Sequence, residues 1–149
     1  MPLTLRGVSS KAFVHKHRVA YADCTVGNHI YYGRYLDLLE CARGEMFRSL
    51  EMSFATLQEQ GEIFPVIEAR LKYKFPARYD DVLSIEIWPT VAERVRLNFA
   101  YRLTNQNDVL ILTGETLHVC TGLDDKPRRL NATLAAALAP FVRAAEATE

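Results

Sequence analysis

Polar and aromatic side chains are concentrated in residues 21–32, which read YADCTVGNHIYY. The stretch carries a carboxylate, a thiol, a hydroxyl, an amide and an imidazole, from Asp23, Cys24, Thr25, Asn28 and His29. His29 is the best candidate for moving a proton, because histidine is the residue type that titrates near neutral pH. Cys24 has no evident base that would activate it as a nucleophile. The stretch is therefore a candidate site for proton-transfer chemistry, and its alternative is a structural turn, because Gly, Asn, Asp and Thr are also turn and cap residues.

A helix that begins near Gly33 must position this stretch. Apolar residues recur there at spacings of three or four and form one stripe, made up of Tyr31, Tyr35, Leu38, Leu39, Ala42, Met46 and Leu50. That period is typical of an amphipathic helix buried on one face. We expect a long helix over 32–51 and a short one over 53–61, which Gly61 ends.

Strands are predicted on both sides of these helices. Residues 12–21 alternate in polarity before the helix, and residues 67–75 alternate after it. The second of these strands is expected to bury one face, made up of Ile67, Ala69, Leu71, Tyr73 and Phe75. Three more strands are expected over 82–92, 94–105 and 109–123.

The C-terminal part and the sheet complete the expected fold. Asn131 is expected to cap a last helix, which Pro140 should break. Consecutive strands usually pair as an antiparallel meander. The helix over 32–51 is the only long element that can cover the sheet, so the sheet should wrap it. The fold class is α+β: a long central helix wrapped by a five-stranded antiparallel sheet, in a single domain over 1–149 with a flexible arm over 1–11.

A comparison of widths favours assembly beyond one copy. One helix covers about 10 Å, whereas five strands at roughly 4.8 Å span more than 20 Å. Part of the sheet, or its edge, is left in need of a partner. We expect a homodimer or homotetramer, formed by edge pairing or by back-to-back helices.

Composition excludes several classes of function. The 18 basic and 18 acidic residues cancel, so nothing in the net charge indicates a nucleic-acid or membrane partner. No apolar run suits a signal peptide or a membrane span, and a cytoplasmic location is expected. The three cysteines, Cys24, Cys41 and Cys120, lie too far apart in the sequence for a metal-ligand motif or a disulfide framework.

Two motifs point to a known family. The first comprises an Asp at a strand end, a Gly-containing turn, an apolar-aromatic pair and a helix start, at Asp23, Gly27-Asn28, Tyr31-Tyr32, Tyr35, Glu40 and Ala42-Arg43. The second reads Tyr73-x-x-Pro76-Ala77-Arg78-x-Asp80-Asp81. Together with the order of elements over residues 13–130, they resemble the hotdog-fold 4-hydroxybenzoyl-CoA and short-chain acyl-CoA thioesterase group. The resemblance implies hydrolysis of an acyl-CoA or acyl-carrier-protein thioester at sites between subunits, with no metal or redox cofactor.

The chain departs from that group at one important position. The catalytic carboxylate of the group is the second Asp of an Asp-x-Asp pair, and Thr25 stands at that position here. Asn28 replaces a glycine of the motif, and His29 stands where an aliphatic residue is usual. A threonine hydroxyl can orient a water or the thioester carbonyl, but it cannot serve as a base at neutral pH. The resemblance therefore makes Thr25, His29 and Asp23 the catalytic candidates, with Asp23 also suited to holding the turn.

The resemblance also implies the remaining site residues. Backbone N–H groups at the helix start would hold the oxyanion, at Tyr32 with Tyr31 as its neighbour, and Asn28 would line the site. Glu40 points about 140° from the centre of the apolar stripe. It would reach a site only through a partner subunit, and otherwise it would pair with Arg43 or Arg34. Phosphates of CoA would meet Arg78, Lys126 and Arg128.

Two other functions stay open at this point. A non-catalytic protein that binds acyl thioesters would also account for the threonine at position 25. A hydratase-type hotdog enzyme ranks below both, because its loop places Asp and His about five residues apart, whereas Asp23 and His29 are six apart.

Overall fold

The computed structural model describes residues 12–146, so the arm expected over residues 1–11 lies outside the described part. Five strands form one antiparallel sheet in the order β1-β5-β6-β7-β4. Their bounds are β1 Phe13–Arg18, β4 Val66–Tyr73, β5 Val82–Glu93, β6 Arg96–Thr104 and β7 Leu110–Val119. A separate two-stranded ladder pairs β2 (Cys24–Thr25) with β3 (His29–Ile30).

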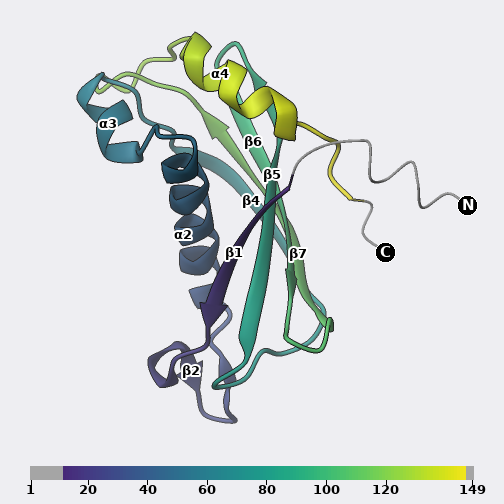
Figure 1. The fold of residues 1–149 in the computed structure, drawn as a ribbon. Helices are drawn as coiled ribbons and strands as arrows, with labels where there is room; N and C mark the ends of the chain where they lie inside the picture. Colours follow the sequence, from purple (N-terminus) through teal and green to yellow (C-terminus); the bar gives the residue numbers. More distant parts are fainter. Residues whose placement is uncertain (1–11, 147–149) are drawn as a thin grey trace, which may run out of the picture.

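The long helix α2 (Arg34–Ser49) lies along one face of the curved sheet, as Figure 1 shows. The predicted stripe is buried over most of its length, and Leu39, Ala42 and Met46 are inaccessible to solvent. Facing them are alternate residues of the central strands, including Ile85, Leu103 and Leu112. The prediction of a central helix wrapped by a five-stranded sheet is therefore confirmed.

Short elements close the ends of this core. The 3-10 helix η1 (Tyr21–Asp23) follows β1, and α3 (Phe54–Glu59) follows α2. Asn131 caps α4 (Ala132–Leu138) by accepting hydrogen bonds from the backbone of Thr133 and Leu134, and α4 packs against β5. The α-helix ends before Pro140, where a single 3-10 turn, η2 (Ala139–Phe141), takes over. Within residues 12–146 no helix is both long and apolar enough to cross a bilayer.

The predicted meander is wrong for one strand. β5, β6 and β7 do pair in sequence order, but β4 pairs with β7 and not with its neighbour in sequence, β5. The segment after β4 crosses to the opposite edge of the sheet. There Asp80 and Asp81 form backbone hydrogen bonds with Val19, just after β1, at 3.0 and 2.8 Å. β1 fills the edge beside β5 that a meander would have given to β4.

The predicted burial of β4 is also wrong. Ile67, Tyr73 and Phe75 are 59%, 49% and 50% exposed, and only Leu71 is partly buried. Tyr73 and Leu71 pair with Leu112 and Gly114 of β7, so they do share the helix-facing side of the sheet. They stay exposed because β4 is an edge strand and α2 packs most closely against β1 and β5, toward the opposite edge of the sheet. The edge strand therefore leaves apolar side chains uncovered in a single copy of the chain.

Candidate functional site

Thr25 and His29 are brought together by a tight hairpin. They are direct partners in the β2–β3 ladder, so their side chains leave the same face of it. Gly27 and Asn28 turn the chain between them with φ angles of 99° and 63°, and Asn28 N–H donates to Thr25 O at 3.1 Å. Glycine and asparagine are the residues that adopt positive φ most readily. The two catalytic candidates are thus adjacent because the turn residues fit this bend.

The hairpin rests on the second motif. Ile30 N–H donates to Ala77 O at 2.9 Å, and the side-chain amide oxygen of Asn28 accepts from Tyr79 N–H at 3.4 Å. The guanidinium of Arg78 donates to Gly27 O at 3.3 Å. Segments about 50 residues apart in sequence therefore form one structural unit, and Asn28 has a clear role in anchoring it.

Asp23 is the buried junction of three elements. Its carboxylate accepts hydrogen bonds from His17 Nε2 of β1 at 2.9 Å, from Arg34 Nε of α2 at 2.8 Å and from Ala20 N–H at 2.9 Å. The carboxylate side chain is 1% exposed. Burial acts to raise the pKa of Asp23, but these hydrogen bonds outweigh burial and hold the pKa below its ordinary value. Asp23 is thus a charged support that fixes the hairpin against the start of α2.

At the helix start, the backbone N–H groups of Tyr32 and Gly33 have no hydrogen-bond partner among the described residues. Tyr31 N–H is already used, because it donates to Asp23 O at 3.2 Å. Tyr32 N–H has no hydrogen-bond partner among residues 12–146. The ring of Tyr31 folds over Gly33, where a Cβ would come within 2.9 Å of it. Of the two predicted oxyanion donors, only the Tyr32 N–H is available.

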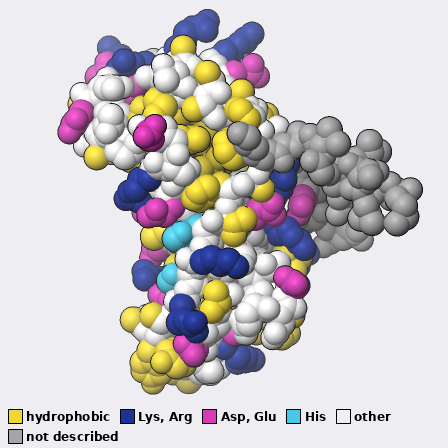
Figure 2. All heavy atoms as spheres, viewed as in Figure 1, with side chains coloured by type: hydrophobic (Ala, Val, Ile, Leu, Met, Phe, Trp, Pro, Cys, Tyr) yellow, Lys and Arg dark blue, Asp and Glu magenta, His cyan; other side chains and the backbone are white. Residues whose placement is uncertain are grey.

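The predicted residues of the stretch line two neighbouring grooves. Thr25, Asn28 and Tyr31 border one of them. His29 and Tyr32 border the other, together with Tyr35, Tyr73, Lys74, Phe75 and Pro76. Figure 2 shows hydrophobic side chains gathered at the lower end of the molecule, where Figure 1 places β2. Tyr31 and Tyr32 are 54% and 63% exposed, so both grooves open onto a surface that is unusually apolar for solvent contact.

The three predicted CoA-binding cations do not converge. Arg78 lies at the hairpin. The guanidinium of Arg128 donates to Gln60 O and Gly61 O, just after α3 and beyond the far end of α2. Lys126 is exposed in the turn that precedes Arg128. Since α2 is about 24 Å long at 1.5 Å per residue, one bound phosphate group cannot meet both ends.

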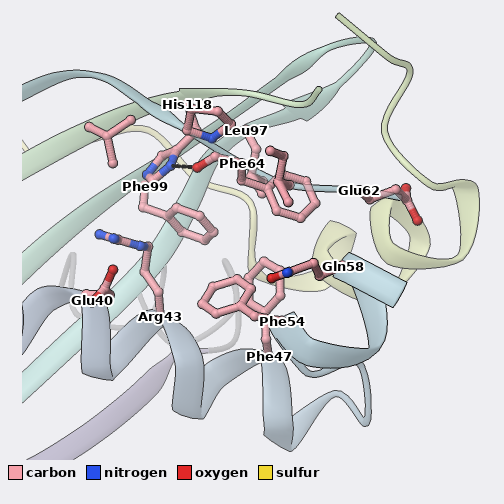
Figure 3. A pocket seen from close by; sticks show the side chains of 13 residues that line it. Glu40, Arg43, Phe47, Phe54, Gln58, Glu62, Phe64, Leu97, Phe99 and His118 are labelled. Carbon is pink, nitrogen blue, oxygen red and sulfur yellow. Dashed lines mark hydrogen bonds between the residues drawn. The ribbon is translucent and has the colours of Figure 1, made fainter. Parts of the chain in front are cut away.

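Glu40 lies neither at the hairpin nor near Arg128. It lines a cavity of about 290 Å³ between α2, α3 and the sheet. Figure 3 shows Glu40 and Arg43 at one end of this cavity, with the rings of Phe47, Phe54 and Phe99 beside them. Glu40 is exposed, as its helical angle predicted, and it forms no ion pair with Arg43 or Arg34 in the part of the chain that the structure describes. It reaches the cavity of its own subunit, which the sequence did not indicate.

A buried polar chain that the sequence analysis missed lies beside the same cavity, and its two end residues, Arg43 and His118, line it. The guanidinium of Arg43 donates to Tyr101 Oη at 2.9 Å, and Tyr101 Oη lies 2.6 Å from Thr116 Oγ1. His118 Nε2 lies 2.8 Å from Thr116 Oγ1, and His118 Nδ1 lies 3.0 Å from Phe64 O. One feature of the sequence could have located two of these residues. The alternation of β7 places Thr116 and His118 at positions that face the helix.

His118 makes the folded protein sensitive to acid. Burial lowers the pKa of His118 to about 4, whereas an unfolded histidine titrates near 6.5. Between these values only the unfolded chain takes up the proton, so the free energy of unfolding should fall by roughly 3 kcal/mol as the pH drops from about 6.5 to about 4. Above pH 6.5 both states are neutral and the effect vanishes.

The measurement is urea unfolding at a series of pH values. The variant His118→Gln should lose this part of the pH dependence, while other titrating groups contribute equally to both proteins. Parallel pH curves for the two proteins would show that His118 titrates normally in the folded state.

The structure also describes the three cysteines and the residue types that can bind metals. All three cysteines are free, and burial together with the nearby Asp23 and Asp81 carboxylates raises the pKa of Cys24. A raised pKa disfavours the nucleophilic thiolate. In the part of the chain that the structure describes, no three His, Cys, Asp or Glu residues are grouped to hold a metal ion.

Comparison with known proteins identifies related chains. A family model described as the thioesterase-like superfamily matches residues 19–145. The acyl-CoA thioester hydrolase YbgC of Escherichia coli O6:H1 is 34% identical over 120 residues, which are 80% of this chain and 90% of that protein. The acyl-CoA thioesterase YbgC of Haemophilus influenzae is 32% identical over 103 residues, 68% of this chain and 74% of that protein.

Solved structures share the fold. A 1,4-dihydroxy-2-naphthoyl-CoA thioesterase from Synechocystis, Slr0204, superposes with a TM-score of 0.81 at 22% identity, covering 87% of this chain and 96% of that chain. A DHNA-CoA thioesterase from Staphylococcus aureus superposes with a TM-score of 0.75 at 28% identity, covering 79% of this chain and 80% of that one.

Proposed function

The chain belongs to the thioesterase-like superfamily, and from that membership we propose that it hydrolyses an acyl-CoA thioester to a free acid and a thiol. The observation that carries this proposal is the similarity to the acyl-CoA thioester hydrolase of Escherichia coli over most of both chains. An acyl-carrier-protein thioester is the alternative substrate, because the two carriers share the phosphopantetheine arm that ends in the thioester.

The oxyanion would be held at the start of α2. In thioester hydrolysis, water adds to the carbonyl carbon, and the carbonyl oxygen becomes negative in the tetrahedral intermediate. The Tyr32 N–H, which has no partner among residues 12–146, lies just before the N-terminus of α2, the end that carries the positive pole of the helix dipole. Tyr31 would contribute through its ring, which borders the Thr25 groove, and not through its N–H, which Asp23 O occupies.

Water activation would fall to the Thr25 and His29 pair. His29 would take a proton from the attacking water, and Thr25 would orient that water or the carbonyl. When the C–S bond breaks, the proton held by the imidazole passes to the departing thiolate, so that acid and thiol are released. The pairing of these residues in the hairpin supports this division of roles. Asp23 would act as a positioning residue, because its carboxylate is buried and fully engaged.

Substrate binding would use the surroundings of the hairpin. Asn28 and Tyr31 border the groove at Thr25. Arg78, which lies at the hairpin, is the cation we propose for a CoA phosphate. Lys126 and Arg128 lie near the other end of α2, so they would bind CoA only from another subunit.

We propose that two copies pair through the β4 edges. Antiparallel pairing about a two-fold axis would bring Val66 at the start of one β4 close to the partner's Tyr73 at the end of the other. Val66 borders the cavity that contains Glu40, and Tyr73 borders the groove of His29 and Tyr32. The cavity of one subunit and the hairpin of the other would then form one continuous site. This arrangement would also cover the apolar side chains exposed on β4.

Weakening this edge should dissociate the assembly. The wild-type chain is expected to sediment as a dimer or tetramer at micromolar concentration, and Ile67→Lys should raise its dissociation constant at least tenfold, because a charge would enter an apolar interface. Val109→Lys is the matched control, since Val109 is also exposed but lies in the β6–β7 turn. A monomeric wild-type protein at tens of micromolar would contradict edge pairing.

The function is tested by thiol release from acyl-CoA and acyl-carrier-protein substrates of different chain lengths. Turnover of at least one acyl thioester is expected. The second candidate, a protein that binds acyl thioesters without cleaving them, is favoured by the threonine at position 25. It predicts a thermal shift with acyl-CoA and no thiol release, and that result would refute the hydrolase.

A further inference from the structure

Arg43 is a buried cation without a counter-ion. Its residue is 8% exposed, it borders the 290 Å³ cavity, and none of the ion pairs formed within residues 12–146 includes it. Buried charges in proteins are normally paired, because removing them from water is costly. A guanidinium left in this condition beside a cavity is suited to pairing with an anion that enters the cavity.

The hydrogen bonds around Arg43 have only one possible direction. A guanidinium can only donate, the Phe64 carbonyl can only accept, and burial lowers the pKa of His118 to about 4, so its imidazole is neutral at pH 7. These three conditions together determine each link. Arg43 donates to Tyr101, the Tyr101 hydroxyl donates to Thr116, and Thr116 donates to Nε2 of His118. His118 in turn donates from Nδ1 to Phe64 O. This direction requires a neutral His118 and consumes the donors of Tyr101, Thr116 and His118.

Arg43 is therefore the member of this polar chain that has unused N–H donors. Arginine has five N–H donors, and the structure uses one of those of Arg43 in a hydrogen bond, to Tyr101. The rest of the cavity wall is largely apolar, with Phe47, Phe54 and Phe99 among its lining. A ligand here would meet rings along its length and one positively charged end.

The two carboxylates on the cavity do not remove this charge. Glu40 is exposed to solvent and lies outside ion-pair distance of Arg43. Glu62 is 3% exposed, but it accepts a hydrogen bond from Asn131 at 3.2 Å, and Figure 3 shows it at the opposite end of the cavity from Arg43. Glu40 thus shares Arg43's end of the cavity without forming an ion pair with it, and Glu62 lies at the opposite end with a hydrogen bond from Asn131.

We propose that the cavity receives the acyl group of the thioester and that this acyl group ends in a carboxylate, which pairs with Arg43. This inference rests on the proposed function and names its substrate class. A cavity of about 290 Å³ is at the small end of ligand sites, so the acyl group is short or contains a single ring. The substrates are therefore CoA monothioesters of dicarboxylic acids.

Substrate pairs matched in size but different in charge test this assignment. One pair is 4-carboxybenzoyl-CoA and 4-isopropylbenzoyl-CoA, and the other is glutaryl-CoA and hexanoyl-CoA. The wild-type protein should favour the carboxylate member in kcat/KM on the order of 10²-fold, because a neutral analogue leaves the buried cation unpaired. Arg43→Met should abolish the preference while keeping turnover of the neutral member, and Arg43→Lys should restore part of it. Arg48→Met, one turn further along α2, is the control and should leave the ratio unchanged.

Each result has a defined meaning. Hydrolysis of neutral thioesters with no preference for the charged members, or a preference that survives Arg43→Met, overturns the inference and leaves the proposed function standing. If no thioester is hydrolysed, the proposed function fails. In that case the inference is tested by binding of non-hydrolysable thioether analogues of 4-carboxybenzoyl-CoA and 4-isopropylbenzoyl-CoA. The wild-type protein should bind the charged analogue more tightly than the neutral one, and Arg43→Met should bind the two equally. Circular dichroism and urea unfolding identify a variant that does not fold, in which case Arg43→Lys and Arg43→Gln supply the comparison.

Discussion

Asp23→Ala is expected to destabilise the folded chain by about 3 kcal/mol, because it removes the buried charge that joins β1, the hairpin and α2. The loss would be larger if both partners were buried, but His17 and Arg34 are 25% and 43% exposed and can regain water. Since the pKa of Asp23 is lowered in the folded state, its charge contributes stability above the unfolded pKa of about 3.9. That contribution is lost as the pH falls through the lower folded pKa.

Urea unfolding at neutral pH measures this effect. Asp37→Ala is the matched control, because Asp37 pairs with the same Arg34 at 2.9 Å but its side chain is 62% exposed. Its replacement should change the free energy of unfolding by no more than about 0.5 kcal/mol. A large loss of activity in Asp23→Ala with unchanged stability would instead assign Asp23 to the catalytic machinery.

Thr25→Ala and His29→Ala should each lower kcat at least about 10²-fold on the best substrate, because each removes a group that handles the attacking water. Thr25 is exposed and His29 is partly exposed, so neither variant should lose more than about 1 kcal/mol of stability. The loss would therefore be one of chemistry and not of folding.

Conservative variants separate the two roles. Thr25→Ser keeps the hydroxyl and should retain most of the activity, whereas His29→Gln keeps hydrogen bonding but cannot take up a proton and should resemble His29→Ala. Wild-type rates in both alanine variants would remove the pair from the mechanism and would direct attention to Glu40 and its cavity.

Much of the site was predictable because its signals are local. The turn residues at 27 and 28 predicted the hairpin bend, and the stripe that includes Leu38 and Leu39 predicted the buried helix that follows it. Both depend on preferences of short segments, which the sequence expresses directly. The resemblance of two motifs then placed those segments in the hotdog family, which the match over residues 19–145 confirms.

What the sequence did not predict depends on contacts between distant segments. Nothing near Arg43 in the sequence indicated that it reaches Tyr101, 58 residues away, or that Asp23 gathers donors from β1 and α2. The alternation of β4 placed Ala69, Leu71 and Tyr73 on the correct face of the sheet, but a bulge interrupts it at Ile67, and burial failed because the strand lies at an edge. Pairing order sets which strand is at an edge, and alternation carries no information about order.

The sequence by itself determined the long helix, the five strands of the main sheet, a turn at residues 27 and 28, and the family to which the chain belongs. Only the tertiary structure decided that Asp23 is a buried support. Within residues 12–146, it also decided that Tyr32, and not Tyr31, keeps a free N–H and that Arg43 has no counter-ion beside a cavity. The physical reason is that secondary structure follows from the spacing of side chains along one segment. The state of a donor, an acceptor or a charge depends on which other segments come within about 3 Å of it.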